Sequence, residues 1–256
     1  KSTDGTVKVS GENMNIAIII SYDGTNYSGW QSQPNKKTVQ DELEKALFKV
    51  FNKQIKTYAS GRTDALVSAI GQVVSFNCDD LFPPEKLMYL LNDNLPLDIR
   101  IVKSYEVDND FNARFNAKNK TYEYNFYFGK TSNAYFDKTF SFFKGELNIN
   151  DMQLACKFLV GTFDFSSFCA SGSEVEDKTR TIFNAKIECV NKEYNQYKFV
   201  VSGNGFLYNM VRILMGTLIN VGYGKIKPES IVEIINKKDR KFAGATVKAH
   251  GLVLVK

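Results

Sequence analysis

The amino-acid sequence predicts an α+β fold in which the order β-α-β-β-α-β occurs twice, as two tandem ferredoxin-like halves. Short β-branched and aromatic runs alternate with segments whose apolar residues recur at helical spacing. A polar break, Asp108-Asn109-Asp110, separates the two sets of elements. We therefore expect the halves to join sheet to sheet. The result would be one extended mixed, mainly antiparallel sheet with helices packed on it and a central cleft.

The first half contains six expected elements. Residues 15–22 (NIAIIISY) are β-branched and apolar, which predicts a strand. Thr38 can cap a helix in which Val39, Leu43 and Leu47 share one face. The remaining elements expected here are strands at residues 55–58, 71–78 and 99–107 and a helix from Pro84 to Leu91.

The second half repeats this order without a residue-level repeat. Residues 120–128 (KTYEYNFYF) alternate, so Tyr122, Tyr124, Phe126 and Phe128 should share one face of a strand. The other expected elements are helices at residues 151–160, 205–221 and 228–236 and strands at residues 181–190, 196–202 and 251–256.

Three segments follow from this pattern. Residues 1–13 lack the apolar centre of a signal peptide and are expected to be a tail. Residues 14–110 should form an N-terminal α+β domain that carries a charged loop, and residues 111–256 a C-terminal α+β domain that completes the site.

Composition excludes several classes of protein. The longest apolar run, residues 16–20, is far too short to span a bilayer, so we expect no membrane segment. The four cysteines lie far apart without a C-x-x-C motif, and His250 is the single histidine of the 256 residues. This pattern predicts separate cytosolic thiols and no metal site. The net charge of +5 is compatible with a polyanionic partner without requiring one.

The charged loop at residues 61–64 (GRTD) is the first candidate for chemistry. It lies between two expected strands, which would hold an ionised Asp64 toward a ligand. The structural alternative is that Asp64 bonds a nearby backbone N–H and that Arg62 pairs with it, as in many turns.

Arg212 lies in a helix that is apolar nearly all round, so its charge should need a partner. Asp64 is one candidate, because a guanidinium would keep its carboxylate ionised. Glu188 and Asp164 are alternatives that would serve stability alone. Tyr122 is either a core tyrosine or a ring that stacks on a base while its hydroxyl reaches the substrate.

Basic residues recur beside the expected loops, as phosphate contacts would require. Each pair alone could be solvated surface, but with the aromatic strand they favour RNA over an acidic small molecule. These residues are Lys36-Lys37, Lys118 with Lys120, Lys178 with Arg180, Lys237-Lys238 and Arg240-Lys241. The turn Gly203-Asn204-Gly205 before the long helix could also aim backbone N–H groups at an anion.

Ordered motifs along almost the whole chain from Met14 on resemble the tRNA pseudouridine synthase A family. They are YDGT at 22–25, GWQ at 29–31, TVQ at 38–40, GRTDA at 61–65, LP at 95–96, RF at 114–115, KTY at 120–122, DFSSF at 164–168, RTI at 180–182, GFLYNMVR at 205–212 and GL at 251–252.

This resemblance implies isomerisation of uridine to pseudouridine at tRNA positions 38, 39 and 40 of the anticodon stem-loop. It implies a cytoplasmic homodimer that needs no cofactor and no metal. Carried over to this sequence, Asp64 is the nucleophile, Tyr122 stacks on the target base, and Arg212 pairs with Asp64. Arg62 fills the space left by the flipped base.

The chain departs from the family after Asp64, where glycine, valine, histidine and alanine are usual and residues 66–69 read Leu-Val-Ser-Ala. Leu66 lacks the freedom of glycine to adopt positive φ, and Ser68 lacks an imidazole. This departure motivates one alternative, a non-catalytic RNA-binding or tRNA-chaperone protein on the same fold. Another alternative is a glycosidase, which would need a second acid near Asp64.

Overall fold

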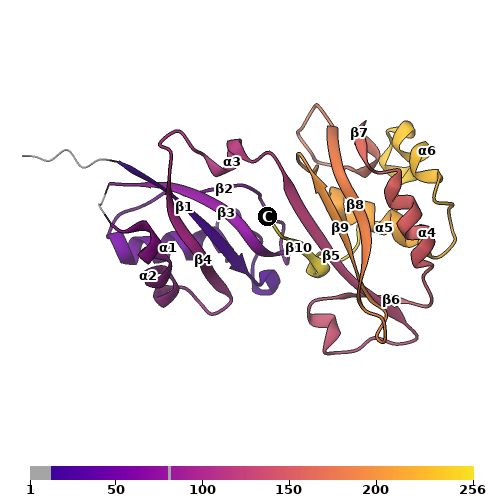
Figure 1. Cartoon of the computed structure of the whole chain (residues 1–256), viewed down its shortest axis with the longest axis horizontal. Coiled ribbons are helices and arrows are strands. Elements are labelled where there is room, and N and C mark those ends of the chain that lie inside the picture. The colour runs from indigo at the N-terminus through magenta and orange to yellow at the C-terminus, as the bar shows by residue number, and fades with distance from the viewer. Residues whose placement is uncertain (1–12, 80–81) are drawn as a thin grey trace, which may run out of the picture.

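The computed structural model describes residues 13–79 and 82–256. The expected tail, residues 1–13, therefore lies outside the described residues apart from Asn13. Figure 1 shows two halves side by side along the long axis of the molecule, with the final strand between them. None of the helices in the described part of the chain is long and apolar enough to cross a membrane.

One sheet of ten strands connects the two halves among the described residues. Its main order is β4-β1-β3-β10-β5-β9-β8-β7, with β2 beside β3 and β6 beside β5. Most pairs are antiparallel, but β10 is parallel to β3 and β6 is parallel to β5. The C-terminal strand β10 (Leu252–Leu254) thus joins the sheet of the first half to that of the second. The predicted α+β fold with an extended mixed sheet is confirmed.

The first half has the predicted order of elements. They are β1 (Met14–Tyr22), α1 (Val39–Phe51), β2 (Tyr58–Ala59), β3 (Ser68–Cys78), α2 (Leu87–Asn94) and β4 (Ile99–Val107). The prediction for residues 55–58 was wrong in extent, because β2 has only two residues. Strand β3 begins three residues earlier than predicted, at Ser68, so that residues 65–67 alone separate the charged loop from it.

The second half contains three short elements that the sequence pattern did not predict, α3, β6 and β7. In order, its elements are α3 (Ala113–Asn116), β5 (Lys120–Gly129), β6 (Ser141–Lys144), α4 (Ile149–Lys157), β7 (Gly161–Asp164), β8 (Thr179–Asn191), β9 (Gln196–Gly203), α5 (Met210–Gly222), α6 (Ser230–Lys237) and β10. Strand β5 places Tyr124, Phe126 and Phe128 on one face as predicted, and all three are buried.

Helix α5 begins five residues later than predicted. Asn209, the residue before it, has a left-handed backbone with φ 57°, so residues 205–209 form a loop. Arg212 is consequently in the first turn of α5 instead of near its middle. The turn at residues 203–205 is therefore not at a helix N-terminus, and the Asn204 N–H donates to the Thr181 carbonyl (3.0 Å).

Two hydrophobic cores meet at the centre of the sheet. The first lies among β1, β3, β4, α1 and α2, and it includes Leu254 of β10. The second lies among β5, β8, β9, α4 and α5, and it includes Val67, three residues after Asp64. Tyr122 packs against both cores. The charged loop and the start of β5 are therefore fixed at the junction of the two halves.

Candidate active site

Hydrogen bonds from β1 and the following loop fix the charged loop between β2 and β3. The Trp30 N–H donates to the Thr63 carbonyl (3.0 Å), and the Leu66 N–H donates to the Tyr27 carbonyl (3.3 Å). The hydroxyls of Tyr22 and Thr63 share a further bond of 2.7 Å. Asp64 therefore lies in a segment whose backbone is held on both sides.

Two glycines allow this close packing. Gly29 has φ 92°, and a Cβ on it would lie 2.7 Å from the Thr63 carbonyl oxygen. A Cβ on Gly24 would lie 2.1 Å from the Val67 carbonyl oxygen. A side chain at either position would push the charged loop away from its support.

The carboxylate of Asp64 is half-buried and has no hydrogen-bond or ion-pair partner among the described residues. The structural alternative, a turn carboxylate bonded to a backbone N–H and paired with Arg62, is thus not observed. Burial raises the pKa of Asp64, whereas the charge of Arg212 lowers it by a smaller amount. An unpartnered half-buried carboxylate costs stability, and such groups are found mainly at functional sites, which makes Asp64 a candidate for the chemistry.

Arg212 does not contact Asp64 directly, which corrects the expected ion pair. Its Nε donates to the Val247 carbonyl (2.7 Å), and its Nη1 donates to Asn209 Oδ1 (2.9 Å). In the described part of the chain, no carboxylate oxygen lies within 4.0 Å of its guanidinium. The prediction that Arg212 holds the pKa of Asp64 below its usual range was also wrong, because burial has the larger effect.

The two alternative acids for Arg212 have other partners. Glu188 pairs with Lys186 and Lys198, and Asp164 pairs with Lys238. Neither acid forms an ion pair with Arg212. Among these three acids, Asp64 is therefore the one whose carboxylate interacts with Arg212, through a charge interaction without direct contact.

Tyr122 lies at the start of β5, beside the charged loop. Its ring makes an edge-to-face contact with Phe206, with ring centroids 5.3 Å apart. Its hydroxyl lies close to the charged loop, since a Cβ on Gly61 would be 3.7 Å from it. This hydroxyl has no hydrogen-bond partner among the residues described. Burial, with a contribution from Asp64, raises the pKa of Tyr122, so the phenol is neutral at physiological pH.

Two adjoining cavities meet at Asp64. The inner cavity, about 140 Å³, is lined by Asp64, Tyr122, Phe206, Leu252 and neighbouring residues of the 206–212 segment. The outer cavity, about 500 Å³, is lined by Gln31, Lys36, Tyr208 and others. Both share Arg62, Thr63, Asp64, Tyr208, Asn209 and Arg212. The inner cavity is smaller than the roughly 300–1,000 Å³ of typical ligand sites, a size suited to a single planar base.

The structure brings together four of the six predicted site residues. Asp64, Arg62, Tyr122 and Arg212 all line the inner cavity. Lys118 is exposed in the segment before β5, and neither Lys118 nor Lys120 lines the two cavities. Burial lowers the pKa of Lys120, and the charge of Arg180 nearby lowers it further.

Sequence reasoning missed Tyr208, Asn209 and Gln31, which also line the cavities. Asn209 carried a usable signal, because asparagine tolerates the left-handed backbone better than most residues and so favours a helix boundary. The Val247 carbonyl that holds Arg212 carried none, because every residue has a carbonyl.

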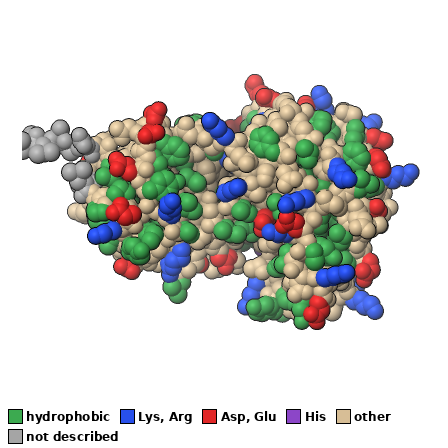
Figure 2. All heavy atoms as spheres, viewed as in Figure 1, with side chains coloured by type: hydrophobic (Ala, Val, Ile, Leu, Met, Phe, Trp, Pro, Cys, Tyr) green, Lys and Arg blue, Asp and Glu red, His purple; other side chains and the backbone are tan. Residues whose placement is uncertain are grey.

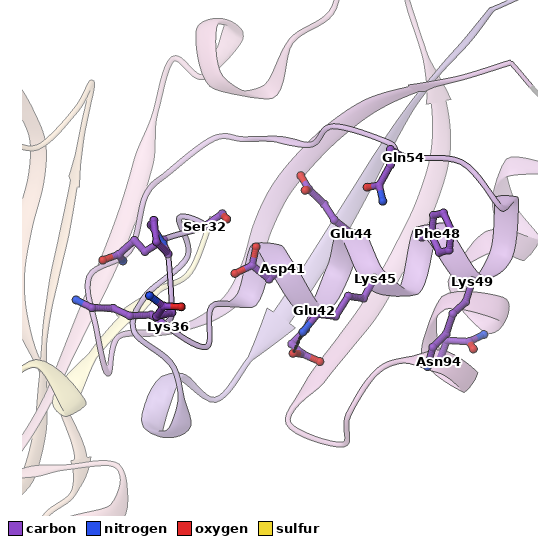
Figure 3. Close-up of a pocket in the computed structure, with 13 residues that line it drawn as sticks. Ser32, Lys36, Asp41, Glu42, Glu44, Lys45, Phe48, Lys49, Gln54 and Asn94 are labelled. Carbon is purple, nitrogen blue, oxygen red and sulfur yellow. Dashed lines mark hydrogen bonds and ion pairs between the residues drawn. The ribbon is translucent and has the colours of Figure 1, made fainter.

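A larger cavity, about 830 Å³, lies along α1 and is not lined by Asp64 (Figure 3). Its carboxylates have structural partners. Glu44 accepts from the Thr57 N–H (3.0 Å), Glu42 pairs with Lys45 (3.0 Å), and Asp41 accepts from the hydroxyl of the cap residue Thr38 (2.6 Å). Size alone therefore does not identify the active site.

Neither the distribution of surface charge nor a group of metal-ligating residues helps to locate the site. Figure 2 shows Lys and Arg side chains dispersed over the visible face of both halves. Within the described ranges, no group of three or more His, Cys, Asp or Glu residues could hold a metal ion.

Leu66 adopts the backbone conformation that the sequence suggested it would avoid. Its φ is 70°, its side chain is 44% exposed, and Ser68 Oγ accepts a hydrogen bond from the Gly24 N–H (3.0 Å). The left-handed conformation costs a residue with a side chain about 1–2 kcal/mol. Replacement by glycine would remove this cost, but the greater flexibility of glycine in the unfolded chain would offset part of the gain in stability.

Leu66→Gly should therefore raise the free energy of unfolding by up to about 1 kcal/mol, measured by urea denaturation. Ile70→Gly, at an exposed position inside β3, is the comparison and should destabilise the protein. A loss of stability in Leu66→Gly would contradict the strain at this position.

Comparisons with known proteins agree on one family. A family model described as tRNA pseudouridine synthase matches residues 18–116 and 155–256. "tRNA pseudouridine synthase A" of Caldicellulosiruptor saccharolyticus is 46% identical over 94% of this chain and 98% of its own. The Bacillus subtilis protein of the same name is 43% identical over 94% of this chain and 97% of its own.

A chain of the solved Cbf5-Nop10-Gar1 complex matches 79% of this chain and 54% of its own length, with 14% identity and a TM-score of 0.35. That likeness is too distant to inform the site. The ranges matched by the family model include Asp64 and Arg212, and the full-length relatives cover 94% of the chain. The chain therefore belongs to the tRNA pseudouridine synthase family.

Proposed function

We propose that this protein isomerises uridine to pseudouridine in tRNA, at positions 38, 39 and 40 of the anticodon stem-loop. The observation that carries the proposal is the half-buried, unpartnered carboxylate of Asp64 on the wall of a base-sized cavity. Membership of the family and the names of its full-length relatives support the reaction class.

In the proposed reaction the target nucleotide leaves its stack, and its base enters the inner cavity. Ionised Asp64 attacks either the base or the ribose, and the bond that it forms with the nucleotide breaks again before the product leaves, which regenerates the carboxylate. The N1–C1′ bond breaks, the uracil turns while it is confined, and a C5–C1′ bond forms. The C5 proton is lost and N1 gains a proton, so that the product is an isomer of the substrate and no cofactor is consumed.

The other residues have proposed roles around this step. Tyr122, a neutral phenol with a free hydroxyl, would stack on the base and transfer a proton. Arg62 would fill the space that the flipped base leaves, and Arg212 would favour the ionised form of Asp64. Lys118 and Lys120 would bind tRNA phosphates, with Arg180 beside Lys120 adding positive charge.

The alternative functions are less well supported. A glycosidase would need a second acid, and Asp64 is the one acidic residue among the described residues that line the two cavities. A non-catalytic RNA-binding protein would have no use for an unpartnered carboxylate, and the comparisons do not support it. We further propose that the protein acts as a homodimer in the cytoplasm, where its tRNA substrate is found.

Sequencing of modification sites in tRNA from cells with and without this gene tests the proposed function. We expect pseudouridine at one or more of positions 38, 39 and 40 to disappear in the deletion strain and to return with the wild-type gene. Unchanged modification at all three positions would overturn the proposal.

Asp64 should make both activity and stability depend on pH. Activity requires the ionised carboxylate, so it should be lost as the pH falls through the pKa of Asp64, which lies above the ordinary value of 3.8. As the pH rises from the ordinary pKa to the raised pKa, Asp64 loses its proton in the unfolded chain before it does so in the folded protein. The free energy of unfolding therefore decreases as the pH rises through this range. Above the raised pKa, the full cost of the buried charge remains.

Asp64→Asn should therefore unfold at a higher temperature than the wild type at pH 7, and at the same temperature well below pH 3.8. Thermal denaturation followed by circular dichroism at both pH values measures the difference. A lower unfolding temperature for the variant at pH 7 would contradict the raised pKa.

A further inference from the structure

We propose that the outer cavity is a second nucleotide subsite, in which the base next to the flipped uridine stacks on Tyr208. This inference rests on the proposed function and extends it. The ligand is a nucleobase of the same RNA strand with its phosphate.

The two cavities are arranged for consecutive nucleotides. They share the wall formed by Arg62, Asp64 and Arg212, so that a base in the inner cavity has the outer cavity directly beside it. Neighbouring nucleotides are joined through one phosphate, so a nucleotide next to the target must lie against an adjoining surface. At about 500 Å³, the outer cavity is within the size range of sites for small organic groups.

The outer cavity collects polar side chains that the protein itself does not use. Gln31, Lys36 and Arg62 are exposed, and their side chains have no hydrogen-bond or ion-pair partner in the residues that the structure describes. An amide can both donate to and accept from the edge of a base, whereas an ammonium or guanidinium group suits a phosphate. Together they provide the two kinds of contact that a nucleotide requires.

Tyr208 provides an aromatic surface at the mouth of the site. Its side chain is 49% exposed and lines both cavities. Its backbone is fixed, because its carbonyl accepts from the Ala170 N–H (3.0 Å) and the next residue, Asn209, takes the left-handed conformation that starts α5. An exposed ring on a fixed backbone suits stacking with an unpaired base.

The other aromatic residues at the site are already engaged. Tyr122 and Phe206 pack edge to face inside the inner cavity, where they can contact only the target base. Tyr208 is the aromatic residue that lines the outer cavity among the residues described. Because every base has a flat face, this subsite should accept any base and should favour an unpaired one.

The test combines a change in the RNA with a change in the protein. Single-turnover rates of pseudouridine formation are measured on an anticodon stem-loop that is intact, abasic directly 5′ of the target, or abasic directly 3′ of it. The proteins are the wild type, Tyr208→Phe, Tyr208→Leu and the control Tyr135→Leu. Tyr135 is 77% exposed and lines neither cavity.

We expect one of the two abasic substrates to slow the wild type by between about 5-fold and 150-fold, the range for loss of one stacked base. Tyr208→Leu should show a similar loss on the intact RNA and no further loss on that abasic RNA. Tyr208→Phe, which keeps the ring, should lose less rate than Tyr208→Leu, and Tyr135→Leu should behave like the wild type.

The subsite would be overturned if the rate losses from Tyr208→Leu and from the abasic RNA multiply when the two changes are combined. It would also be overturned if neither abasic site changes the rate of the wild type. In those cases the wild type still forms pseudouridine on the intact RNA, and the proposed function stands. Absence of product from the wild type on intact RNA would instead overturn the proposed function, and this inference with it.

Discussion

Asp64→Asn should slow pseudouridine formation by about 10⁴-fold or more, with little change in tRNA affinity. The amide has the shape of the carboxylate but cannot act as a nucleophile, and losses of this size are usual when a nucleophile is removed. The carboxylate has no structural partner among the described residues, so the exchange should leave the fold intact. Single-turnover rates and a filter-binding titration with tRNA measure the two effects.

Asp93→Asn is the matched control, because Asp93 is an exposed aspartate of α2 that lines neither cavity. It should retain the full rate. A rate for Asp64→Asn within tenfold of the wild type would remove Asp64 from the chemical step, whatever its affinity for tRNA.

Arg212→Ala should have the second-largest effect, a loss of about 10²–10³-fold in rate, comparable to the loss of one electrostatic contact in an active site. Without the guanidinium, burial acts alone on Asp64 and raises its pKa further. The acid side of the pH–rate profile should therefore move to higher pH. Single-turnover rates measured across the pH range give both quantities.

Asn209→Gly tests the orientation of Arg212 without removal of its charge. Glycine keeps the left-handed backbone at this position but removes the acceptor for Arg212 Nη1. The rate should fall by less than in Arg212→Ala, and the acid side of the profile should move in the same direction. Asn52→Gly is the control, because Asn52 is also left-handed (φ 52°) and lies at the C-terminal end of α1.

For Arg212→Ala itself, a pH–rate profile that does not shift would contradict the coupling between Arg212 and Asp64.

The fold could be predicted where local patterns and tertiary packing agree. Thr38 caps α1 through its side chain, which accepts from the Asp41 N–H, and the alternating face of β5 is buried as its sequence indicates. Strand β2 was predicted too long because residues 55–57 are apolar or β-branched in part but pair with no strand. The domain boundary near residue 110 stays a prediction.

The site was predicted less completely than the fold. Motifs located Asp64, Tyr122, Arg62 and Arg212, and all four line one cavity. The direct contact between Asp64 and Arg212 was wrong, because a backbone carbonyl 35 residues away in the sequence, that of Val247, satisfies the guanidinium instead. The amino-acid sequence does not show which backbone carbonyl a side chain will contact in the folded protein. Tyr208 was missed because an exposed tyrosine is ordinary until its cavity is known.

The most direct test of the account maps pseudouridine in an unmodified tRNA transcript after incubation with the purified wild type or with Asp64→Ala. The wild type should convert uridine at one or more of positions 38, 39 and 40, while Asp64→Ala should bind the transcript and convert none. Equal conversion by both proteins would show that the lone carboxylate at the centre of the molecule is not the group that performs the reaction.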